Sequence, residues 1–167
     1  MKPSNLRTGF AVARAQGRRH KDAAEALGVS EGEAIAAHAG DHAERLHATP
    51  LRPAWLELLQ ALEPCGPVLA LTRNHSTVHE KTGIYQNLSG SAHMGLAHGA
   101  DIDLRLFLSK WHAGFAVQEA PLSGGAAALS LQFFDAHGVA VHKVFARDAT
   151  DRDAFRSLVA AFTDTQA

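Results

Sequence analysis

The hydrophobic residues of this chain recur with a helical period towards both ends and with a strand-like period in the middle. Residues 5 to 62 follow the helical pattern, and one helix face is formed by Trp55, Leu58, Leu59 and Leu62. From residue 68 to residue 145, short β-branched and apolar runs replace that pattern. A helical stripe then returns, made by Phe155, Leu158, Val159 and Phe162.

Turn and capping residues divide these regions into elements. Gly28 suits the left-handed end of a first short helix, and Ser30 with Glu33 forms a capping box for a second helix over about 31–39. Pro64 and the Gly66-Pro67 pair mark the change from helix to sheet. The predicted strands cover 68–73, 77–81, 84–88, 92–97, 102–107, 115–119, 127–135 and 139–145.

Two local signals define the end of the chain. The last two predicted strands flank Ala136-His137-Gly138, a hairpin connection in which the glycine supplies a positive φ. Thr150 and Asp153 are predicted to cap the final helix. The sequence therefore predicts one α+β domain over 1–167, with a mainly helical part over 1–63, a large antiparallel sheet over 67–147 and one C-terminal helix over 150–163.

Composition narrows the class of function. Hydrophobic residues make up 46% of the 167 residues, which is typical of a folded domain. Sixteen Lys and Arg nearly cancel 17 Asp and Glu, so no net positive field favours nucleic acid or an anionic membrane. Cys65 is the only cysteine, which excludes an internal disulfide, and no apolar stretch is long enough to cross a bilayer. These features predict a soluble cytoplasmic protein.

Helix-turn-helix spacing over 21–39 offers a DNA-binding alternative. The second helix, however, carries Ala, His and Glu where a DNA reader needs Arg, Lys, Asn or Gln. Such corners are also common in all-α packing, so we disfavour this function.

Three polar residues lie within apolar strand patterns. Arg105 alternates with Ile102, Leu104 and Leu106 and is either a salt-bridge partner or an anion-binding group. Lys143 either binds an anion or extends its ammonium to water. His79 is either a hydrogen-bonded structural residue or a ligand. The 11 histidines form no local zinc motif, and hydrolase and nucleotide-binding motifs are missing as well.

Several blocks, in order along the chain, carry a family resemblance. They are KDAAEALGVS at 21–30, LTRN and VHEKTGIYQN within 71–87, DIDLRLFL at 101–108, LQFFDAHG at 131–138 and HKV at 142–144. With them the chain resembles one amino-terminal repeat of the bacterial HemS/ChuS/ChuX haem-utilisation proteins.

The resemblance implies haem as the cofactor and assigns residues to it. In those proteins a histidine in the segment matching Val78-His79-Glu80 ligates iron, which here is His79, and an arginine in the D-L-R-L-F-L strand faces haem, which here is Arg105. Lys143 is a further candidate for the propionates. Phe107 and Phe133, with Phe134 and Phe145, would supply apolar contacts. Haem needs a nitrogen ligand, an apolar slot and cations, so these residue types fit.

Proteins of the HemS/ChuS type contain two such repeats, whereas this chain holds one. We therefore expect a homodimer. The leading functional hypothesis is a cytoplasmic carrier that exchanges haem with a haem importer or a haem-degrading enzyme. Haem degradation by the chain itself, a haem-free relative and a helix-turn-helix regulator are the alternatives.

Overall fold

The computed structural model describes residues 1–167 and contains two antiparallel sheets and five α-helices. The helices are α1 (Pro3–Ala15), α2 (His20–Ala26), α3 (Glu31–Ala36), α4 (Trp55–Gln60) and α5 (Arg152–Phe162). The strands are β1 (Leu46–Pro50), β2 (Val68–Arg73), β3 (Val78–Gly83), β4 (Leu88–Gly90), β5 (Gly95–His98), β6 (Asp103–Leu106), β7 (Ala113–Glu119), β8 (Ala128–Phe134) and β9 (Ala140–Ala146). Two 3-10 turns, Glu63–Cys65 and Leu108–Lys110, complete the chain.

The large sheet has six strands in the order β1-β7-β8-β9-β2-β3, with every neighbouring pair antiparallel. This arrangement confirms the predicted α+β class with a large antiparallel sheet, N-terminal helices and one C-terminal helix. Strands β4, β5 and β6 form a separate three-stranded sheet. The meander predicted from the sequence is therefore divided between two sheets.

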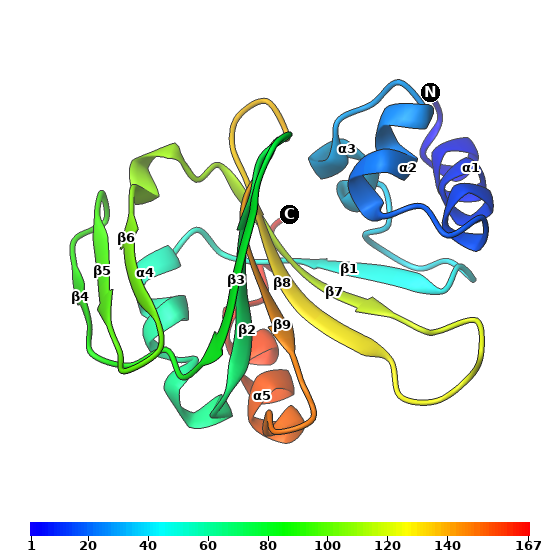
Figure 1. Cartoon of the computed structure of the whole chain (residues 1–167). Coiled ribbons are helices and arrows are strands. Elements are labelled where there is room, and N and C mark those ends of the chain that lie inside the picture. The colour runs from blue at the N-terminus through cyan, green and yellow to red at the C-terminus, as the bar shows by residue number, and fades with distance from the viewer.

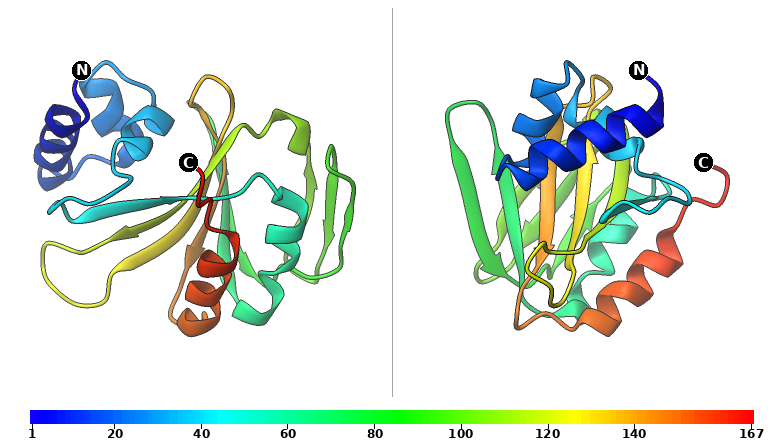
Figure 2. Two further views of the ribbon diagram at one scale, coloured as in Figure 1. Left: turned by 180° about the vertical axis from the view of Figure 1, so that it is seen from behind. Right: turned by 90° about the vertical axis from the view of Figure 1, so that its right-hand side faces the viewer.

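Each face of the large sheet has its own hydrophobic core. One face packs against α4, α5 and the small sheet, with Trp55, Phe133 and Phe155 among the buried residues. On the opposite face α1–α3 pack against β1, β7 and β8 through residues such as Phe10 and Phe134. Figures 1 and 2 show the consequence: the three N-terminal helices form a cluster at one end of the sheet and leave the β2 and β3 end beside it open.

Two glycines allow the helical cluster to approach the sheet. The backbone N–H of Gly32, in α3, donates to the Gly138 carbonyl at 2.9 Å, and a Cβ on Gly32 would lie only 2.9 Å from the Gly138 Cα. Gly138 has a φ of 76°, as the predicted hairpin between β8 and β9 requires. The hairpin tip therefore contacts the start of α3 directly.

Several predicted boundaries were wrong. The region predicted as helical contains β1, an edge strand in which buried Leu46 and Ala48 alternate with the exposed His47. Pro50 is accommodated because an edge strand has one side free of ladder bonds. The strand expected over 84–88 begins only at Leu88. Asp151, rather than Thr150 or Asp153, caps α5 by accepting from the Ala154 N–H, while the Thr150 hydroxyl donates to the Pro67 carbonyl.

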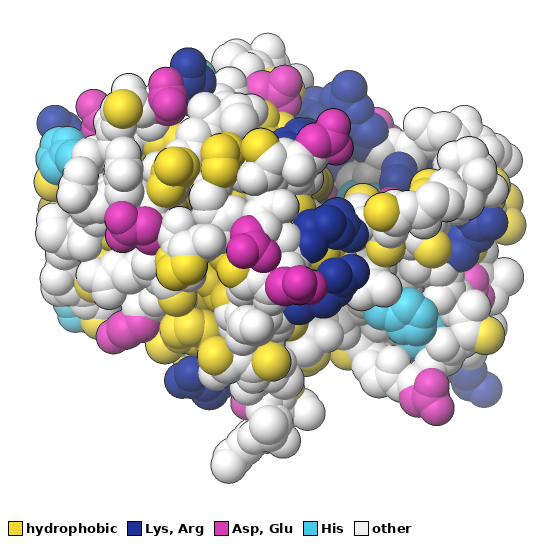
Figure 3. Space-filling view, turned by 90° about the horizontal axis from the view of Figure 1, so that it is seen from below, with side chains coloured by type: hydrophobic (Ala, Val, Ile, Leu, Met, Phe, Trp, Pro, Cys, Tyr) yellow, Lys and Arg dark blue, Asp and Glu magenta, His cyan; other side chains and the backbone are white.

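Charge on the surface is mixed. Viewed from below, where α5 lies, Figure 3 shows Lys and Arg side chains next to Asp and Glu side chains, with hydrophobic side chains between them. This face therefore lacks the single-sign field that attracts nucleic acid. No helix of the structure has the length and apolar character needed to traverse a bilayer.

Candidate functional site

The outer face of the small sheet brings together two of the predicted site residues. The register between β5 and β6 pairs Leu96 with Arg105 and His98 with Asp103, so these four side chains point to the same side. Phe107, two positions beyond Arg105, is 62% exposed. We call Leu96, His98, Asp103, Arg105 and Phe107 the Arg105 face.

The guanidinium of Arg105 is free on this face. The one ion pair there joins His98 Nδ1 to Asp103 Oδ1 at 3.9 Å and leaves Arg105 without a carboxylate partner. Ala97 and Leu106 turn the other way and are buried in the core, which fixes the orientation of both strands. The sheet therefore presents a free cation between apolar side chains to solvent.

His79 lies in a different place. It belongs to β3, pairs with Thr72 of β2 and is exposed. With Lys81 it lines a cavity of about 210 Å³, which is also lined by Ile102 and by Leu104 of β6. Because Arg105 points to the opposite side of β6, the structure does not bring His79 and Arg105 into one cavity.

A buried hydrogen-bond chain lies beneath His79. The Tyr85 hydroxyl is hydrogen-bonded to His142 Nε2 at 2.6 Å, and His142 Nδ1 is hydrogen-bonded to the Thr72 hydroxyl at 2.9 Å. Burial lowers the pKa of His142 to about 4 and raises the pKa of Tyr85 far above its usual range. The His142 ring is therefore neutral, and both of its nitrogens are occupied by hydrogen bonds.

Lys143 and Phe133, the other predicted site residues, lie apart from both regions. Lys143 Nζ is buried and ion-paired with Glu31, which ties β9 to α3. Phe133 is 0% exposed, and its ring centroid lies 4.6 Å from that of Trp111 in the core. The two side chains point to opposite faces of the large sheet, and neither adjoins Arg105. Phe133 is packing for the core and has no surface on which to contact a ligand.

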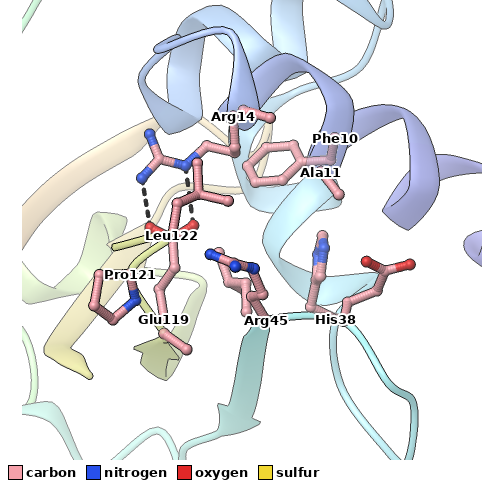
Figure 4. Close-up of a pocket in the computed structure, with 12 residues that line it drawn as sticks. Phe10, Ala11, Arg14, His38, Arg45, Glu119, Pro121 and Leu122 are labelled. Carbon is pink, nitrogen blue, oxygen red and sulfur yellow. Dashed lines mark hydrogen bonds and ion pairs between the residues drawn. The ribbon is translucent and has the colours of Figure 1, made fainter. Parts of the chain in front are cut away.

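A second ionic contact holds the helices to the sheet. Arg14 Nε, in α1, donates to Glu119 Oε2 at 2.9 Å, as Figure 4 shows, and His20 Nε2 lies 3.3 Å from Glu119 Oε1. Burial alone would raise the pKa of Glu119, but the hydrogen bonds from His20 and Arg14 lower it to about 2. Glu119 therefore stays ionised and keeps Arg14 engaged.

Comparison with known proteins agrees with this fold. The model of the haemin-degrading HemS.ChuX domain matches residues 28–162. The chain belongs to the HemS/ChuX family. It is 39% identical to the hemin transport protein HmuS of Yersinia pestis over 147 residues, which is 87% of this chain and 41% of HmuS.

Two solved structures of HemS/ChuX relatives have the same fold. Holo-PhuS, a heme-binding protein from Pseudomonas aeruginosa, superposes with a TM-score of 0.90 at 43% identity, over 99% of this chain and 47% of PhuS. ChuS, a heme-degrading enzyme of Escherichia coli, gives a TM-score of 0.86 at 32% identity, over 98% of this chain and 48% of ChuS. The chain thus spans less than half the length of these relatives.

Sequence reasoning did not assign three residues of the Arg105 face to the site: Leu96, His98 and Asp103. Leu96 and His98 belong to a short strand with little β-branched character, and only the register with β6 shows that they flank Arg105. The available signal was alternation: Ala97, between them, is the small buried residue.

Proposed function

We propose that this chain binds haem against the Arg105 face and acts as a cytoplasmic haem carrier in bacterial haem utilisation. One observation carries the proposal: Arg105 is a free cation between the exposed Phe107 and the partly exposed Leu96. Haem combines an apolar macrocycle with two carboxylates, so it needs apolar contact and a cation close together. Membership of the HemS/ChuX family, together with the similarity to the heme-binding protein PhuS and the hemin transport protein HmuS, supports haem as the ligand.

The residues of the Arg105 face fit parts of haem. A guanidinium can bond a carboxylate twice through its planar fork, so Arg105 suits a propionate. Phe107 and Leu96 offer apolar surface to the macrocycle. His98 offers an imidazole nitrogen, because its pair with Asp103 is long at 3.9 Å. When bound, haem would supply an iron centre, and these side chains would orient it.

The cavity beside His79 is a poorer match for haem. Its volume of about 210 Å³ is below the roughly 300 Å³ at which ordinary ligand pockets begin. Asp101 also lines it and pairs with Lys81 at 3.6 Å, so the cation of this cavity already has a carboxylate partner. Its advantage is His79 itself, to which the family resemblance assigns the iron.

Hemin titration of three histidine variants distinguishes the two positions. A Soret shift lost in His98→Ala but kept in His79→Ala would place the iron at the Arg105 face, whereas the reverse would place it at the cavity lined by His79. His137→Ala, at the exposed tip of the β8–β9 hairpin, is the matched control. If the unaltered protein gives no Soret shift with hemin, the proposal of haem binding is wrong.

Haem degradation is the second candidate function, favoured by the match to the haemin-degrading HemS.ChuX domain and by the similarity to the heme-degrading enzyme ChuS. The Arg105 face offers only His98 and Asp103 as groups that could deliver a proton, and both are solvent-exposed. We expect no rapid, regiospecific breakdown when the haem complex is mixed with a reductant and oxygen, with catalase present. Stoichiometric formation of one biliverdin isomer would establish the enzyme instead.

We further propose a homodimer. The chain spans 41% of HmuS and 47% of PhuS, so two copies of it would together approach the size of these relatives. A symmetric pair would bury the same patch of each copy, with more than about 1,000 Å² in the interface. Light scattering at micromolar concentration should give the mass of two chains. The mass of one chain, with and without hemin, would exclude the dimer.

A further inference from the structure

A groove separates the N-terminal helices from the open end of the large sheet, on the side of the sheet opposite to α4, α5 and the small sheet. It consists of two adjoining cavities of about 560 and 420 Å³, which share Lys21, Glu31 and Arg73 in their walls. In Figure 1, α1–α3 lie to one side of the β2–β3 hairpin, and residues of both regions line these cavities. These cavities exceed the one beside His79 in volume and lie on the opposite face of the large sheet.

The floor of the groove carries both apolar and charged side chains. Leu71, Val78 and Phe145 line the larger cavity from three adjacent strands, and Val29, Val139 and Ala140 line the smaller one. Val78 is 43% exposed, because the helical cluster covers β1, β7 and β8 but not β3. Glu80 and Lys143 lie on the same strands and also line the larger cavity, so small apolar surfaces alternate with charged groups along the groove.

Five cations line the groove, and three of them already have partners. Arg14 is bound by Glu119, Lys143 by Glu31 and Lys21 by Glu25. Arg19 and Arg73 remain, and neither is bonded to a carboxylate. Glu80, beside Leu71 in the sheet register, is the unpaired acid of the groove.

Arg73 is the group that points to a ligand. Its side chain lines both cavities, and it stands opposite Val78 in the register of β2 and β3. Its Nε is buried without any hydrogen-bond acceptor. Buried donors are nearly always paired with an acceptor. A ligand oxygen in the groove could accept the hydrogen bond that no atom of the chain accepts from Arg73 Nε.

We propose that this groove binds a small organic anion, in which a carboxylate or phosphate is held by Arg73 and Arg19 and an apolar body rests on Leu71, Val78 and Phe145. The site is distinct from the Arg105 face, from which the large sheet separates it. Carboxylate and phosphate fit a guanidinium fork equally well, so the anionic group and the apolar body together define the ligand class.

Calorimetric titration of the full chain tests the inference with laurate, adenosine 5′-monophosphate and inorganic phosphate. We expect laurate or the nucleotide to bind at least tenfold more tightly than inorganic phosphate. Arg73→Gln and Arg19→Gln should each weaken that binding about tenfold, whereas Glu80→Gln should strengthen it. Arg156→Gln, which removes one exposed cation from α5, is the matched control and should change nothing.

Hemin titration of the same variants keeps this inference separate from the proposed function. Arg73→Gln should retain the hemin affinity of the unaltered protein, even if it abolishes anion binding. Three results would overturn the inference: no binding of either organic anion below about 1 mM, equal binding of inorganic phosphate, or equal losses in Arg73→Gln and Arg156→Gln. If the protein binds the organic anion but not hemin, the result contradicts the haem proposal and supports the anion site in the groove.

Discussion

Lys143 and Arg105 are both cations on strands with apolar neighbours, yet the fold uses them in opposite ways. Lys143 is buried and bound to Glu31, so its charge joins the helical cluster to the sheet. Arg105 is exposed on the small sheet and has no acidic partner. The difference arises from what covers each strand: α3 lies over β9, whereas nothing in the chain lies over the outer side of β6.

This comparison distinguishes a cation that stabilises the fold through an ion pair from a cation that is free to bind a ligand. A buried cation that is already paired can bind a ligand only by leaving its acidic partner buried without a counter-charge. That change is unfavourable in free energy. A free cation on an open face carries no such penalty. Lys143 is therefore expected to matter for stability and Arg105 for ligand binding, although the sequence pattern around the two is similar.

The largest expected effect is on the stability of a Lys143 variant. Lys143→Met leaves the Glu31 carboxylate buried without its partner and should lower the free energy of unfolding by about 3–5 kcal/mol. The double variant Lys143→Met/Glu31→Leu should recover most of that loss. Urea unfolding measures both. A loss below about 1 kcal/mol in the single variant would mean that the pair is not structural.

The second largest effect is expected from acid, which should lower the free energy of unfolding through buried histidines. The pKa of His142 is lowered by burial from its usual 6.5 to about 4, so the folded state resists a proton that the unfolded chain accepts. Its contribution is complete above pH 6.5 and is lost as the pH falls towards 4, by about 3 kcal/mol at most. Burial also lowers the pKa of His38, which adds to the loss.

The double variant His142→Phe/Tyr85→Phe isolates this contribution, because it removes the titrating ring and the hydroxyl bound to it. Its unfolding free energy should fall less steeply between pH 6.5 and pH 4 than that of the unaltered protein. Equal slopes would show that His142 is hydrated in solution. Arg105 is exposed and bonds to neither His142 nor Tyr85, so Arg105→Gln should leave the pH dependence as it is.

The smallest expected effect is that of an Arg105 variant on hemin affinity. Arg105→Gln should weaken hemin binding about tenfold, or about 1.4 kcal/mol, while changing the unfolding free energy by less than about 0.5 kcal/mol. Arg156→Gln removes an equally exposed cation from α5 and provides the matched control. Equal hemin affinities in the two variants would contradict a role for Arg105.

The fold was largely predictable because most elements carry a local signal. The stripe from Phe155 to Phe162, the Ser30 cap and the Gly138 hairpin each specify their own structure. The division into two sheets was not predictable, because it depends on which strands pair across long separations, such as β2 with β9. Strand β1 was hidden because its alanine and histidine resemble the helical composition around it.

The candidate site was predictable only in part. Alternation along β6 correctly separated Arg105 from the buried Leu106. The same reasoning placed Lys143 among apolar residues but could not reveal Glu31, which lies 112 positions away in the sequence. Phe133 was predicted to contact the cofactor because aromatic residues suit haem, yet Trp55 and Trp111 enclose it in the core.

Paramagnetic broadening tests the central claim most directly. Hemin added to ¹⁵N-labelled protein should broaden the backbone amide signals of β5 and β6, at Gly95–His98 and Asp103–Leu106, and leave those of α1–α3 and β9 sharp. Zinc protoporphyrin, which is diamagnetic, should shift the same β5 and β6 signals without broadening them. Broadening centred on β9 and α3, around Lys143, would contradict the account.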